Sequence, residues 1–213
     1  AVADAPAASA AEVALAAVLR EGDPERLVLA GHSFGAASVL HYLLAASPPR
    51  DVEGPTASPI RGALLLDLWP APLSSDISGV DLQRIGARLR APFVLLLSEF
   101  WEGLEWYSPS CRRLASGAGP RCLAAGVVRG AFHHWVSDSH LWAPAWALRL
   151  LKLMGPGEYR RVHLATVRAL HASLRAMLEP ATEPAPKPAA ATAGQQLRSR
   201  WASLDPEVLE LLG

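Results

Sequence analysis

Residues 27–40 read LVLAGHSFGAASVL, and the fold class of the chain can be inferred from the order of features in this segment. An apolar run leads into a Gly-x-Ser-x-Gly turn, and small and apolar residues typical of a helix follow the turn. This order is that of a nucleophile elbow, in which a serine is held on a strained strand-to-helix turn. We expect a Cβ at position 31 or 35 to clash, because the turn packs the helix close to the strand. Ser33 is therefore the candidate nucleophile.

Apolar runs alternate with helical patterns along the rest of the chain. Each run is short and almost wholly apolar, as expected for a buried parallel strand. The alternation predicts an α/β fold with a mostly parallel sheet and flanking helices. The expected strands are residues 26–31, 62–67, 92–98 and 123–129, and the expected helices are residues 8–20, 34–47, 80–90, 140–154 and 158–178.

The chain has 213 residues, which is enough for one domain with a sizeable core. We expect residues 1–180 to form this domain. Residues 181–196 are rich in proline and alanine and are interpreted as a flexible linker. Residues 197–213 are expected to form a terminal helix or tail.

The composition excludes several classes of protein. Lysine plus arginine equals aspartate plus glutamate at 20 each, so the net charge gives no indication of nucleic-acid binding. The sequence contains no apolar run of about 18 residues, so no transmembrane segment is expected. Cys111 and Cys122 are compatible with one local disulfide or with two thiols. No secretory signal is visible at the start of the sequence, but this absence carries little weight. The compartment stays open, with a cytoplasmic location slightly favoured over a secreted one.

A serine nucleophile needs a base, and the base needs a carboxylate that orients it. In α/β-hydrolases these groups follow in the order serine, acid, histidine. Asp67 ends the next strand after the elbow, so its carboxylate is expected at the same edge of the sheet as Ser33. Asp76 and Asp81, in the following loop, are the alternatives.

The base is expected after the last strand, where two adjacent histidines occur. Position favours His133 or His134 and does not decide between them. The remaining histidines are interpreted as packing or surface residues, or lie beside the expected site: His32, His41, His140, His163 and His171. A metal site made of His133, His134, His140 and Asp138 is a weaker alternative, since its spacing matches no helical ligand pattern.

An oxyanion hole needs two backbone N–H groups. Phe34, the residue after the nucleophile, supplies one of them. The second normally comes from a loop after an earlier strand, and we expect that strand to lie outside this sequence. Glu99 and Glu102 follow the third strand, and we interpret them as solvated loop charges.

Tryptophans gather near the expected base and acid. Trp135, Trp142 and Trp146 follow the histidine pair, and Trp69 lies two residues after Asp67. Ordinary core packing is the simplest interpretation. The alternatives are an acyl pocket or contact with a membrane interface, where tryptophan is favoured.

Five segments together resemble the plasma/type II platelet-activating factor acetylhydrolase family, calcium-independent phospholipases A2 of α/β-hydrolase fold. The resemblance runs in order from about residue 8 to residue 180. The matching segments are GHSFG at 31–35, GALLLDLW at 62–69, PFVLLLSEF at 92–100, VRGAFH at 128–133 with Asp138, and LLKLMG at 150–155.

The resemblance implies that Ser33 is the nucleophile, Asp67 the acid and His133 the base. It further implies hydrolysis of the sn-2 acetyl, short or oxidised acyl ester of phospholipids such as platelet-activating factor, at a membrane or lipoprotein surface. No metal or other cofactor is implied. The alternatives are a general carboxylesterase or lipase, and an inactive hydrolase fragment that acts as an interaction module.

Some features depart from the family pattern. Ala36 stands where the family usually has a second glycine, and residues 181–213 have no recognised counterpart. The family's N-terminal half, with its first strands, is not matched. We therefore expect this chain to form the C-terminal portion of the fold.

Overall fold

The computed structural model of the chain describes residues 21–24, 26–45, 60–73, 81–105, 107–137, 142–179 and 189–212. The helix expected over residues 8–20 lies outside these ranges, as do Asp76, Asp138 and His140. The described elements are β1 (Leu27–His32), α2 (Phe34–Ala45), β2 (Ile60–Leu66), η1 (Ala71–Leu73), α3 (Leu82–Arg88), β3 (Phe93–Ser98), α4 (Glu99–Glu102), α5 (Ser108–Ala118), η2 (Gly119–Arg121), β4 (Cys122–Val128), α7 (Ala145–Leu150), α8 (Tyr159–Leu178), α9 (Ala189–Ala202) and β5 (Leu209–Leu211).

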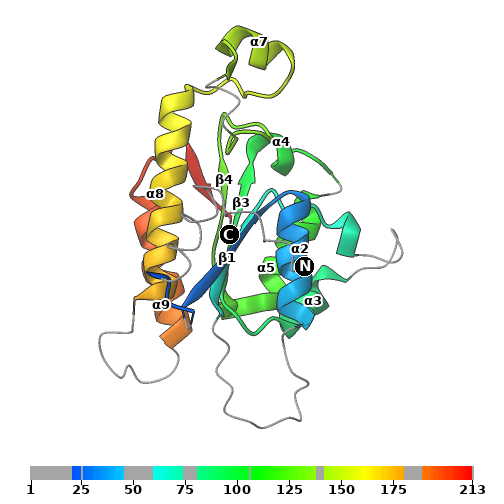
Figure 1. Cartoon of the computed structure of the whole chain (residues 1–213), viewed down its shortest axis with the longest axis vertical. Coiled ribbons are helices and arrows are strands. Elements are labelled where there is room, and N and C mark those ends of the chain that lie inside the picture. Colours follow the sequence, from blue (N-terminus) through cyan, green and yellow to red (C-terminus); the bar gives the residue numbers. More distant parts are fainter. Residues whose placement is uncertain are drawn as a thin grey trace, which may run out of the picture.

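The five strands form one sheet in the order β1-β2-β3-β4-β5. The first four strands are parallel, and β5 pairs antiparallel with β4. Helices α2, α3 and α5 cover one face of the sheet, while α8 and α9 cover the other (Figure 1). The mostly parallel sheet with flanking helices confirms the α/β-hydrolase-like fold expected from the sequence.

The strands form because their side chains enter two cores at once. In β3, Phe93, Leu95 and Leu97 pack on the α2–α3–α5 side, whereas Val94 and Leu96 pack on the α8–α9 side. Successive side chains of a strand point to opposite faces, so a strand covered on both faces must be apolar throughout. This explains why β2, β3 and β4 read as nearly continuous apolar runs. The expectation of a buried strand is wrong for β1, which lies at the edge of the sheet and has only partly buried or exposed residues.

The C-terminal segment differs from its prediction. Helix α9 begins at Ala189, so the last eight residues of the predicted linker are helical. The prolines of this segment end at position 188, and the alanines that follow have high helix propensity. Leu197 and Trp201, four residues apart, are both fully buried and fix the helix on the sheet. Residues 197–212 therefore pack on the domain, and β5 extends its sheet.

The helix predicted over residues 140–154 is shorter than expected. The structure has α7 at Ala145–Leu150, with Pro144 as its N-cap. Proline lacks a backbone N–H and is well suited to the start of a helix. Helix α7 lies at the top of the molecule, at the end of α8 and away from α9 (Figure 1).

Both cysteines are free and buried. Burial raises the pKa of the Cys122 thiol to about 12 and also raises that of Cys111. Neither is a reactive thiolate at neutral pH. No helix in the described part of the chain is long and apolar enough to cross a bilayer.

Truncating Trp201 tests whether α9 belongs to the domain. The indole is fully buried, and its Nε1 donates to the Ala169 carbonyl of α8 at 3.2 Å. We expect Trp201→Ala to lower the free energy of unfolding by about 3–5 kcal/mol, the usual range for a buried tryptophan. Trp146→Ala is the matched control because this indole is 71% exposed. Urea unfolding gives the free energy of unfolding of both variants. An equal loss in Trp201→Ala and Trp146→Ala would contradict the packing of α9 on the domain.

Candidate active site

Ser33 occupies the turn between β1 and α2. Its φ of 57° lies in the left-handed region, which is strained for any residue with a side chain. The Ser33 N–H donates to the Leu66 carbonyl of β2 at 2.9 Å. The Ser33 carbonyl in turn accepts from the Trp69 N–H at 3.3 Å. Two backbone hydrogen bonds to the neighbouring strand segment therefore hold the serine in this conformation.

The two glycines of the turn have different roles. A Cβ built on Gly31 would lie 2.3 Å from the Gly35 carbonyl oxygen, so only glycine fits position 31. A Cβ on Gly35 meets no described atom within 4 Å. The expected clash is thus confirmed at Gly31, whereas the prediction for Gly35 is wrong because that position faces open space. Ala36, which departs from the family pattern, is fully buried in the core.

Asp67 follows β2 directly and lies at the same edge of the sheet as Ser33. Its side chain is fully buried, and its φ of 42° is also left-handed. The carboxylate accepts hydrogen bonds from the Ser98 N–H at 2.6 Å and the Ser98 hydroxyl at 2.7 Å. Sequence reasoning missed Ser98. The signal was its place at the end of β3, the next strand in the sheet.

The ring of His133 lies between Asp67 and Ser33. Its Nδ1 is 2.9 Å from Asp67 Oδ2, and its Nε2 is 3.0 Å from Ser33 Oγ. Because a carboxylate only accepts, Nδ1 carries the proton, and Nε2 is left to accept from the serine hydroxyl. The indole of Trp101 stacks on the ring with centroids 4.2 Å apart and planes 11° from parallel. This geometry orients the imidazole toward the serine.

His134, the other candidate, has a different environment. Its ring is 5.3 Å from that of His133 and approaches it edge-on. His134 is an exposed residue, and among the described contacts no hydrogen bond joins it to Ser33 or Asp67. Partial burial and the neighbouring His133 lower the pKa of His134.

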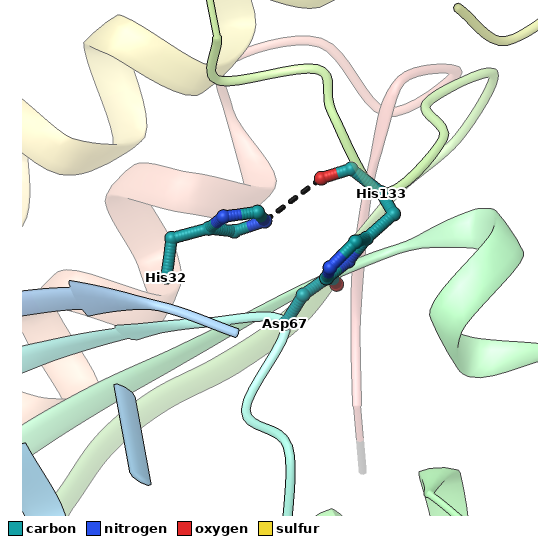
Figure 2. Close-up of side chains that lie close together, drawn as sticks. All are labelled: His32, Asp67 and His133. Atoms are coloured by element: carbon teal, nitrogen blue, oxygen red, sulfur yellow. Dashed lines mark hydrogen bonds and ion pairs between the residues drawn. The ribbon is translucent and has the colours of Figure 1, made fainter. Parts of the chain in front are cut away.

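His32, which precedes the serine, supports the segment that carries His133. Its Nε2 lies 2.8 Å from the His133 carbonyl oxygen, and the two rings are 4.5 Å apart (Figure 2). A carbonyl only accepts, so His32 Nε2 carries a proton and donates. Burial, with a contribution from His133, lowers the pKa of His32. His32 is therefore neutral at pH 7, which limits charge repulsion beside an imidazolium.

Ligand atoms of His32, Asp67 and His133 lie within 4.8 Å of one another, close enough for a metal to be considered. However, each side chain is already hydrogen-bonded, and Asp67 accepts three bonds. A metal here would have to break the Asp67–His133 bond, so the donor set fits a hydrogen-bonded relay better than a cation. The other metal alternative includes Asp138 and His140, which lie outside the described residues.

The remaining acidic candidates have structural contacts. Asp81 caps α3, accepting from the Gln83 and Arg84 N–H groups. The prediction that Glu99 and Glu102 are solvated loop charges is wrong. Glu102 pairs with Arg112 at 2.8 Å, and Glu99 pairs with residues at the end of β4. Folding brings Glu99 beside Arg129, 30 residues away in the chain, and Glu102 beside Arg112, 10 residues away.

Phe34 is the first residue of α2. The first N–H groups of a helix have no carbonyl partner within it, so the Phe34 N–H is available at the serine. The helix N-terminus also carries partial positive charge. The Phe34 ring is 6.1 Å from that of Trp69 and is more than half exposed.

A mostly parallel sheet with a strained serine and a hydrogen-bonded histidine–aspartate pair at its carboxyl edge defines an α/β-hydrolase-like protein. The chain matches the family described as platelet-activating factor acetylhydrolase, isoform II, over residues 15–183, and it belongs to that family. It is thus a hydrolase of the phospholipase or esterase type with a lipid substrate. A comparison with curated proteins gives no match.

Paired substitutions test the elbow. We expect Gly31→Ala to lower the free energy of unfolding by about 1–3 kcal/mol or more, because overpacking against a backbone carbonyl forces the turn to move. Gly35→Ala is the control and should be neutral or slightly stabilising, since glycine inside a helix costs about 0.5–1 kcal/mol relative to alanine. Urea unfolding of the two variants gives the comparison. Similar losses at both positions would contradict this account.

Proposed function

We propose that Ser33, His133 and Asp67 act as a catalytic triad in ester hydrolysis. The observation that carries the proposal is the continuous hydrogen-bond relay from the serine hydroxyl through the imidazole to a buried carboxylate. A serine hydroxyl is a weak nucleophile at neutral pH, and a base in contact with it removes this limitation. Each contact of the relay has a length typical of a formed hydrogen bond.

In the first half of the reaction, Ser33 Oγ attacks the ester carbonyl while His133 Nε2 takes its proton. The imidazolium that forms is stabilised by Asp67 through the Nδ1 hydrogen bond. The Phe34 N–H donates to the developing oxyanion. The tetrahedral intermediate then collapses, the acyl group stays on Ser33, and the alcohol leaves with the proton from His133.

In the second half, water attacks the acyl-serine and gives a proton to His133. The second tetrahedral intermediate uses the same oxyanion donor. Its collapse releases the carboxylic acid, and His133 returns the proton to Ser33 Oγ. Water is the only co-reactant in this scheme, and every proton that His133 accepts is donated again.

For the substrate, we propose the sn-2 ester of phospholipids that carry an acetyl, short or oxidised acyl chain. Platelet-activating factor, a 1-alkyl-2-acetylglycerophosphocholine, is the type substrate that the family description supports. A fold does not determine a substrate, so acyl preference separates this proposal from a general carboxylesterase or lipase. Comparable turnover of acetyl and long-chain phospholipids would favour the latter.

Labelling with a fluorophosphonate probe tests the triad directly. We expect one adduct, on Ser33, identified by peptide mass spectrometry, and none in Ser33→Ala. Asp67→Asn should lower kcat on 4-nitrophenyl acetate by about 10⁴-fold, as in other triads, because the asparagine favours the wrong imidazole tautomer. Ser38→Ala, an exposed serine on α2, is the matched control. A folded wild-type chain that neither labels nor turns over ester would favour an interaction module.

We further propose that the α7 region contacts the phospholipid surface. Four large apolar side chains are exposed there, at 85% for Trp142, 71% for Trp146, 76% for Leu150 and 66% for Leu151. Trp146 and Leu150 are four residues apart on α7 and share one face of that helix, and Trp142 lies just before its start. Exposed apolar groups with tryptophan are typical of interfacial segments.

Vesicle flotation tests this contact. The double variant Trp142→Ser/Trp146→Ser should bind phosphatidylcholine vesicles at least about tenfold more weakly, because each indole removes a large apolar area from water on insertion. Tyr42→Ser on α2 is the control, since this ring is also 55% exposed but lies on another element. Equal binding by the wild type and the double variant would overturn the proposal.

A further inference from the structure

Helix α4 lies against the segment that carries His133, and successive residues of the helix contact successive residues of that segment. The Phe100 N–H donates to the Ala131 carbonyl at 3.3 Å, and the Phe100 and Phe132 rings are 5.1 Å apart. One residue further along each segment, Trp101 stacks on His133. Residues 99–101 thus meet residues 130–133 in sequence order.

Glu99 makes the first contact of this series. Its Oε2 accepts from the Gly130 N–H at 2.8 Å, and its Oε1 lies 3.4 Å from the Arg129 guanidinium. Gly130 is the point where the chain leaves β4, and its φ of 75° is left-handed. A Cβ at Gly130 would lie 2.7 Å from the Gly157 backbone, so this turn has little room.

Arg129 is also held by the C-terminal segment of the chain. Its N–H donates to the Val208 carbonyl at 2.6 Å, and its guanidinium donates to the Glu210 carboxylate of β5. The hydrogen bond with Glu210 raises the pKa of Arg129, so the cation is permanent. The turn at Gly130 therefore lies between an anchored arginine and a carboxylate on α4.

We propose that Glu99 is a positioning residue for His133. By accepting from the Gly130 N–H it sets the direction in which the segment leaves β4, and so the place of the imidazole three residues later. This inference rests on the proposed role of His133 as the base. The side chain of Glu99 is 43% exposed, so its ion pair adds little stability, and the backbone hydrogen bond carries the effect.

Two substitutions separate the hydrogen bond from the charge. Glu99→Ala removes both, whereas Glu99→Gln keeps a side-chain oxygen that accepts from Gly130. We expect Glu99→Ala to lower kcat on 4-nitrophenyl acetate by about 10- to 100-fold with KM little changed, because small misplacement of a catalytic group is costly. Glu99→Gln should stay within about threefold of the wild type, since its amide oxygen replaces the acceptor.

Glu102→Gln is the matched control. Glu102 is on the same helix and lies 4.0 Å from the Arg129 guanidinium, but it does not accept from Gly130. We expect this variant to keep wild-type kcat. A kcat loss in Glu99→Gln or Glu102→Gln as large as in Glu99→Ala would assign the effect to charge and overturn the proposal.

A second measurement does not depend on activity. Hydrogen exchange of the peptide spanning residues 129–137 should be faster in Glu99→Ala than in the wild type, and unchanged in Glu102→Gln. Unchanged exchange in Glu99→Ala would overturn the positioning role whether or not the chain hydrolyses esters. If the wild type fails to label at Ser33 while the exchange difference is present, the proposed function fails and the structural link from Glu99 stands.

Discussion

The buried carboxylate of Asp67 is the group on which the rest of the site depends. An ionised carboxylate without solvent contact is very costly unless hydrogen bonds replace its hydration. Here two donors come from Ser98 at the end of β3, and the third comes from His133 after β4. Satisfying this one group therefore joins the carboxyl ends of three strands, and it leaves the imidazole only one direction in which to present Nε2.

The parallel sheet makes this arrangement possible. Parallel strands end at one edge, and the in-register pairs His32 with Leu66 and Leu66 with Leu96 bring the serine turn, the aspartate and Ser98 together there. The strained conformations of Ser33 and Asp67 both occur at this edge, where the chain turns sharply out of a strand. Strain of this kind persists only where surrounding contacts hold it, and it is common at functional sites.

The short helix α4 and the C-terminal strand β5 contact the same edge of the sheet, at the ends of β3 and β4. Ser98 contacts Asp67, Glu99 contacts the turn at Gly130, and Trp101 contacts the face of His133, so three residues within one four-residue stretch contact two site residues and the turn before His133. Strand β5 adds Glu210 behind Arg129. The C-terminal segment, interpreted from its composition as partly linker, is thus connected to the site through one arginine.

Local patterns in the sequence were sufficient for the elbow, the four parallel strands and the position of Asp67. A position that only glycine fits, an apolar run and the end of a strand are properties of short segments. They can be recognised without knowing which other segment of the chain packs against them. From the residues alone, His133 and His134 stayed equivalent, and the place of Ser98 and Glu99 at the end of β3 did not connect Ser98 with Asp67 or Glu99 with the turn at Gly130. Only the tertiary structure brings His133 into contact with Asp67 and Ser33, joins Ser98 and Glu99 to their partners, and packs α9 and β5 on the domain. The direction of a loop side chain and the partner of a charge depend on segments that lie 31 to 100 residues away in the chain.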